Sequence, residues 1–281
     1  MSFVAPAPPS RARMRHQARI TAIMASVLML SVLMLSTGCS ETTSADGANA
    51  DGIGGTDADA ATGPTTTIAR TRADGPGADL SQELTGGNGV FMGSMATKGQ
   101  AEAGYIETEL VAAGDAVRYD AGPEWTEDGR WDFTQLDEAP APYRTRALVR
   151  RPSDSADFSG TVVIEWLNVS AGLDADPEWS NLQEELIREG HAWVGLSTQL
   201  IGVEGGPVLV SVPGAEGIVG QGLVNTDAVR YGSLEHPGDS YSFDIFTQVA
   251  RAVREGDGLG GLEPQQVLAA GESQSAMALV T

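Results

Sequence analysis

Short apolar runs alternate with longer segments of helical periodicity in the second half of the chain. Three runs are almost continuously apolar, as is typical of strands buried on both faces of a sheet: residues 160–168, 191–197 and 266–270. Apolar residues recur at helical spacing over residues 176–190, where Asp176 precedes Pro177, and over residues 240–255. The order strand, helix, strand, helix, strand predicts an α/β fold with a mostly parallel sheet flanked by helices.

Two upstream segments have the alternating pattern of strands, namely residues 104–119 and 143–151. The segment between them, residues 125–131, is rich in turn-forming residues, so we expect an irregular connection there. Residues 200–238 are rich in glycine and have little periodicity. They are therefore expected to form a long excursion between two elements of the sheet.

The first 39 residues have the pattern of an export signal. Arginines lie between residues 11 and 19, residues 20–35 are apolar and uncharged, and Ser36-Thr37-Gly38-Cys39 follows. A small residue before a lone cysteine resembles the lipobox of bacterial lipoproteins, although Ser36 stands where that family usually has leucine. The resemblance implies that Cys39 is lipidated and anchors the protein to the membrane. Two alternatives stay open: an uncleaved membrane anchor at residues 20–35, and conventional secretion. All three predict an exported, extracytoplasmic protein.

Residues 40–90 are built mainly from Gly, Ala, Asp, Thr and Ser, and no aromatic residue occurs between Phe3 and Phe91. Such a segment cannot offset the conformational entropy lost on ordering. We therefore predict a disordered tether over residues 40–90 and a folded domain over residues 91–281.

The charge balance and the rare residue types exclude several classes of function. The chain has 38 acidic and 17 basic residues, a net charge of −21, which gives nucleic-acid binding almost no electrostatic support. Lys98 is its one lysine and Cys39 its one cysteine, and the histidines at 16, 191 and 236 are scattered. We expect no nucleic-acid partner, no metal site and no cofactor.

The third apolar run leads directly into Gly271-Glu-Ser-Gln-Ser275, which is expected to open a helix through residues 277–279. A serine between a strand and a helix is the setting of a nucleophile elbow, written G-x-S-x-G, and Ser275 takes the place of its last glycine. The sharp turn strains the serine backbone, and the amide of Gln274 can donate to a developing oxyanion. The pattern predicts Ser273 as a nucleophile; the alternative is a structural turn with a spectator serine.

Four segments together resemble the α/β-hydrolase superfamily, and more narrowly a bacterial family known by its α/β-hydrolase domain. They are residues 143–152 (YRTRALVRRP), 160–170 (GTVVIEWLNVS), 230–239 (RYGSLEHPGD) and 271–276 (GESQSA). The resemblance implies an esterase or related acyl hydrolase acting on a small-molecule ester or amide. It implies Ser273 as nucleophile, the Gln274 amide as one oxyanion donor, and the loop at Asn168 or Val169 as the place of the second.

The catalytic base and acid are the elements that the sequence lacks. In this superfamily the triad order is Ser, then Asp or Glu, then His, but no acidic residue or histidine follows Ser273. His236 is a candidate pocket residue, although a loop histidine is the simpler interpretation, and His191 is most simply structural. We therefore expect a fragment that lacks the C-terminal half of the hydrolase and is itself inactive. The alternative is a catalytically inactive, hydrolase-like binding module on a tether.

Overall fold

The computed structural model describes residues 75–93, 100–121, 133–208, 217 and 219–280. Its strands are β1 (Asp79–Glu83), β2 (Tyr105–Ala116), β3 (Tyr119–Ala121), β4 (Phe133–Gln135), β5 (Ala141–Pro152), β6 (Thr161–Trp166), β7 (Ala192–Leu196) and β8 (Gln266–Ala270). Its α-helices are α2 (Pro177–Arg188), α3 (Leu200–Glu204), α4 (Gly222–Thr226), α5 (Ala228–Tyr231), α6 (Ser242–Glu255) and α7 (Gln274–Leu279). Two short 3-10 helices, η1 (Ser155–Asp157) and η2 (Asp239–Tyr241), complete the described elements.

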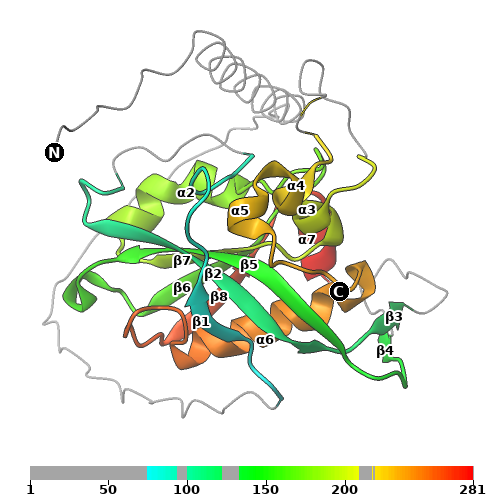
Figure 1. The fold of residues 1–281 in the computed structure, drawn as a ribbon. Coiled ribbons are helices and arrows are strands. Elements are labelled where there is room, and N and C mark those ends of the chain that lie inside the picture. Colours follow the sequence, from blue (N-terminus) through cyan, green and yellow to red (C-terminus); the bar gives the residue numbers. More distant parts are fainter. Residues whose placement is uncertain (1–74, 94–99, 122–132, 209–216, 218, 281) are drawn as a thin grey trace, which may run out of the picture.

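One six-stranded sheet with the order β1-β2-β5-β7-β6-β8 forms the centre of the structure (Figure 1). The three predicted apolar runs form its parallel part, in which β6 pairs with both β7 and β8. The upstream strands β1, β2 and β5 add antiparallel pairs on the other side of β7. Because β6, β7 and β8 are parallel, the segments that follow their carboxyl ends lie at the same end of the sheet.

Helices cover both faces of this sheet (Figure 1). Helix α6 contributes Ile245, Val249 and Val253 to a core that includes Ala147 and Val162 of the sheet. On the opposite face, α2 packs Trp179 and Leu186 against Leu148 and Trp193. The consecutive residues Ala147 and Leu148 of β5 thus enter different cores, as the two-residue period of a strand requires.

The start of α2 differs in one respect from the sequence prediction. Pro177 occupies the first turn as predicted, but the Asp176 side chain makes no capping hydrogen bond. The carboxylate of Glu165 on β6 takes that role by accepting from the N–H groups of Glu178 and Trp179, each at 3.0 Å. Asp176 instead forms an ion pair with Arg150 at 2.6 Å.

Two sequence predictions need correction. The ordered domain begins before residue 91, because β1 at Asp79–Glu83 belongs to the sheet and buries Leu80, and Leu84 directly after the strand is buried as well. The apolar pattern did not predict this strand because it has few apolar residues. Backbone pairing with β2 holds it at the edge of the sheet. Strand β8 forms where predicted but is partly exposed, since β6 is its one neighbour in the described sheet.

Other predictions fall outside the described residues. These are the export signal, Cys39, the tether up to residue 74 and the whole of the irregular connection at residues 125–131. Within the described ranges, no helix combines the length and apolar character needed to cross a membrane.

Candidate functional site

Ser273 lies at the tip of the turn between β8 and α7 with φ 56° and ψ −116°. It is the one residue other than glycine with a positive φ in the described part of the chain. Residues with a Cβ rarely adopt this backbone conformation. Backbone strain of this kind is concentrated at functional positions. Its side chain is exposed. Ser273 therefore has the local geometry that the sequence predicts for a nucleophile elbow.

Small residues allow this turn to close. A Cβ placed on Gly271 would lie 3.0 Å from the Cβ of Ser275 and 3.1 Å from Cδ1 of Leu279, so a larger residue would push α7 away from β8. Ser275, which replaces the last glycine of the motif, is fully buried. The departure from the glycine pattern is thus accommodated inside the turn, beneath the exposed serine.

The backbone N–H of Gln274 is the first in α7 and has no hydrogen-bond partner among the described residues. The neighbouring turn bonds involve other amides: the N–H of Ser275 donates to Glu272 O, and that of Met277 donates to Ser273 O, both at 3.1 Å. A free N–H at a helix N-terminus directly after the serine can donate to an oxyanion. This geometry fits the donor role predicted for Gln274.

Asn168 lies beside the elbow, but its backbone N–H is not a free donor. The N–H and C=O of Asn168 both pair with Ala175, each at 2.9 Å. Its side-chain amide instead donates to Glu272 O at 3.0 Å. The adjacent N–H of Val169 has no hydrogen-bond partner in the described chain. Of the two positions predicted for a second oxyanion donor, Val169 is therefore the one whose N–H is unpaired among the described residues.

Neither histidine in the described part is available to Ser273. His236 is buried; its Nε2 donates to Thr198 O at 2.8 Å, and its Nδ1 accepts from the N–H of Gly238 at 3.1 Å. Burial lowers the pKa of His236, which keeps the ring neutral. His191 directly precedes β7 and so lies at the amino ends of the parallel strands, whereas the elbow lies at their carboxyl ends. Its Nδ1 is 2.7 Å from Ser159 Oγ. Both rings hold loops together.

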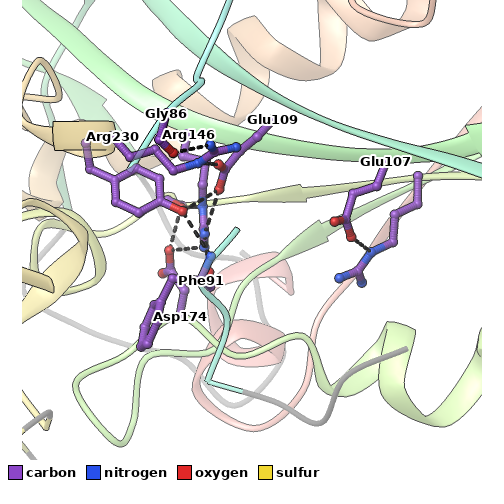
Figure 2. Close-up of polar contacts among 10 residues, drawn as sticks. Gly86, Phe91, Glu107, Glu109, Arg146, Asp174 and Arg230 are labelled. Atoms are coloured by element: carbon purple, nitrogen blue, oxygen red, sulfur yellow. Dashed lines mark hydrogen bonds and ion pairs between the residues drawn. The ribbon is translucent and has the colours of Figure 1, made fainter. Parts of the chain in front are cut away.

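A buried charge network, which the sequence pattern does not predict, supports the loops around the elbow (Figure 2). Arg146 of β5 forms ion pairs with Asp174 at 2.7 Å and with Glu109 of β2 at 3.1 Å, and all three side chains are fully buried. Glu109 also binds Arg230 and accepts from the hydroxyl of Tyr231. Burial by itself would lower the pKa of Arg146, but the two carboxylates outweigh it and raise that pKa.

The network joins three segments that are distant in sequence. Asp174 belongs to the loop after β6, Arg230 to α5, and Phe91, whose backbone oxygen accepts from Arg146, to the segment after β1 (Figure 2). The sequence does show arginines at positions 144, 146 and 150, which lie on one face of β5. From the pattern alone, this charged face would be assigned to solvent.

A second cluster on the same face lies beneath the start of α2. The Arg150 guanidinium is 4.8 Å from the ring centre of Trp179 and 4.7 Å from that of Trp193. Glu165 is fully buried beside them and accepts from the indole N–H of Trp193 at 2.9 Å. Burial raises the pKa of Glu165 to about 8, against three N–H donors that favour its ionised form.

Metal-binding side chains do not cluster in this part of the molecule. No group of three or more His, Cys, Asp or Glu residues is arranged to hold a metal ion within the described ranges. The polar groups at the elbow are a hydroxyl and backbone amides, which suit the stabilisation of negative charge on oxygen.

Comparison with known proteins agrees with this arrangement. The model of a family described as "Alpha/beta hydrolase domain" matches residues 73–281, which covers the sheet, the elbow and both buried clusters. The start of the match at residue 73 also agrees with a domain that begins before β1. No curated protein and no solved structure matches the chain.

Proposed function

Because the chain belongs to the alpha/beta hydrolase domain family, we propose that it is a serine hydrolase with Ser273 as its nucleophile. The substrate is a small-molecule ester or related acyl compound. The observation that carries this proposal is the strained, exposed backbone of Ser273 between β8 and α7, followed by the free N–H of Gln274. A spectator serine in an ordinary turn would have no need of this conformation.

The reaction follows from the groups at the turn. The Ser273 hydroxyl attacks the substrate carbonyl carbon and loses its proton to a general base, while the carbonyl oxygen becomes an oxyanion. The N–H groups of Gln274 and Val169 donate to that oxyanion. Loss of the alcohol leaves an acyl-serine, which water then hydrolyses to a carboxylic acid and free Ser273.

The proposal assigns the general base and its acid to residues outside the described part. His191 and His236 are bonded elsewhere, and the superfamily order would put an acidic residue and then a histidine after the serine. Translation of the reading frame beyond Thr281 tests this assignment: it should continue with both residues. The 281-residue chain alone is then expected to show little or no turnover, since the loss of base function typically removes several powers of ten in rate.

Export belongs to the same proposal. The basic and apolar segments before Cys39 support a lipid anchor at the cell membrane, with substrates met outside the cytoplasm. Incorporation of radiolabelled palmitate into the protein, lost in Cys39→Ala, is the expected result. A soluble, unlabelled protein in the culture supernatant would favour the secretion alternative.

Hydrolysis of short p-nitrophenyl esters by the protein from the complete reading frame tests the activity. We expect turnover that falls by at least about 10³-fold in Ser273→Ala, whereas Ser233→Ala, at an exposed turn serine, is unchanged. Equal activity in Ser273→Ala would refute the nucleophile. Absence of both turnover and fluorophosphonate labelling would favour a hydrolase-like binding module.

A further inference from the structure

Asn168 links the loop after β6 to the elbow through its side chain, and we propose that it is a positioning residue that sets the oxyanion site. Its amide Nδ2 donates to Glu272 O at 3.0 Å. Its Oδ1 accepts from the N–H of Ser170 at 3.0 Å. This inference rests on the proposed function, because the geometry it controls belongs to the reaction at Ser273.

The bond to Glu272 acts directly on the nucleophile's backbone. The Glu272 carbonyl and the Ser273 nitrogen belong to the same peptide plane. A hydrogen bond that fixes this oxygen therefore fixes the orientation of the peptide that precedes the strained Ser273 backbone. The same oxygen accepts the N–H of Ser275 at 3.1 Å. Asn168 thus adds a second donor to the carbonyl that begins the turn.

The bond from Ser170 acts on the other side of the site. A side-chain oxygen that accepts from the backbone two residues ahead forms an Asx turn, which curls the loop at Val169. The N–H of Val169 is left without a partner in the described chain. One side chain therefore both curls the loop that carries this donor and ties the loop to the turn that carries the Gln274 donor.

The loop has a second anchor that makes its position well defined. The backbone pair between Asn168 and Ala175 closes residues 168–175 into a ring. The Asp174 carboxylate in this ring is held by the buried Arg146 at 2.7 Å, and the N–H of Gly93 donates to Asp174 O at 2.6 Å. With its base held by the sheet, the loop's distance from the elbow depends on the Asn168 side chain.

Asn168→Asp separates the two bonds. The new carboxylate can still accept from the N–H of Ser170, but when ionised it has no hydrogen to donate to Glu272 O and repels it. We expect kcat for p-nitrophenyl esters to fall about 10–100-fold with little change in KM, because small misplacements of reacting groups cost up to about 10². The rate constant for fluorophosphonate labelling of Ser273 should fall in parallel.

The pH dependence of this variant gives a readout that a merely structural role would not move. Below the pKa of the new carboxyl, its O–H can donate to Glu272 O and restore the link. The ratio of variant to unmodified kcat should therefore rise as the pH falls below the range of an ordinary carboxyl. Asn168→Ala, which cannot be protonated, should lose activity at every pH.

Asn225→Asp is the matched control. The Asn225 side-chain amide lies in α4 and, like that of Asn168, donates to the backbone: to Glu204 O at 3.0 Å and Gln221 O at 2.9 Å. It should leave kcat and the labelling rate unchanged. All measurements use the protein from the complete reading frame. If Ser273 labels normally and Asn168→Asp keeps its kcat and labelling rate, the positioning role is refuted alone. If the unmodified protein fails to label at Ser273, the proposed function fails and the inference fails with it.

Discussion

Replacing Ser273 by glycine is expected to stabilise the protein relative to replacement by alanine. Both substitutions remove the hydroxyl, so they differ in the Cβ alone. With φ 56° and ψ −116°, a Cβ at this position is strained, and strain of this kind costs about 1–3 kcal/mol. Alanine keeps that strain and glycine releases it.

The gain is opposed by the unfolded chain. Glycine gives the unfolded state more conformations than alanine does, which costs about 0.4–1 kcal/mol of stability. A control position without strain measures this cost directly. Ser233 lies in an exposed turn and is not among the residues with positive φ. There, alanine should be more stable than glycine by about 0.4–1 kcal/mol.

Urea unfolding followed by tryptophan fluorescence provides the assay, since Trp179 and Trp193 are fully buried. The free energy of unfolding is compared for alanine and glycine at position 273 and at position 233, with equal m values as the condition for comparison. The difference between the two comparisons isolates the strain and should be about 1–3 kcal/mol in favour of glycine at 273. The reasoning is refuted if glycine is the less stable choice at both positions by the same amount.

Three further predictions concern the buried charges. Arg146→Met should cost about 3–5 kcal/mol in urea unfolding because it removes the buried guanidinium that pairs with Asp174 and leaves Glu109 with Arg230 as its remaining ion-pair partner. By contrast, Arg188→Met, at an exposed ion pair, should cost less than about 1 kcal/mol. Burial raises the pKa of Glu165 from an ordinary 4.5 to about 8 in the folded state. Because the folded state keeps the Glu165 proton at pH values where the unfolded state has lost it, stability should fall as the pH rises from 4.5 to about 8. A Glu165→Gln variant with the same pH–stability curve as the unmodified protein would contradict this. The lowered pKa of His236 acts in the opposite direction: the unfolded state binds the proton more readily, so melting temperatures should drop as pH falls below about 6.5, and His236→Gln should reduce that drop.

The parts of the fold that were predictable have strong local signals. Continuous apolar runs predicted β6, β7 and β8, and helical periodicity predicted α2 and α6. The elbow at Ser273 was predictable because its strain requires a particular context: a strand before it, small neighbours such as Gly271 and a helix after it. In each of these elements, local propensity and tertiary packing favour the same structure.

The parts that were not predictable depend on partners far away in sequence. Strand β1 forms because β2 offers it a backbone edge, which no pattern within residues 79–83 reveals. Arg146 is buried because Glu109 and Asp174, 37 and 28 residues away, are brought to it by the sheet. The N–H groups of α2 are capped by Glu165 of β6 and not by the adjacent Asp176. Such long-range pairings decide between alternatives that are equally compatible with the local sequence.

Covalent labelling of Ser273 distinguishes an activated nucleophile from an ordinary surface serine. The protein from the complete reading frame is treated with a fluorophosphonate, whose phosphorus is attacked by the serine oxygen with loss of fluoride, and the adduct is located by peptide mass spectrometry. We expect one adduct on Ser273, absent from Ser273→Ala and retained in Ser233→Ala. An unlabelled Ser273, in a protein whose circular dichroism shows it to be folded, would contradict its role as the nucleophile.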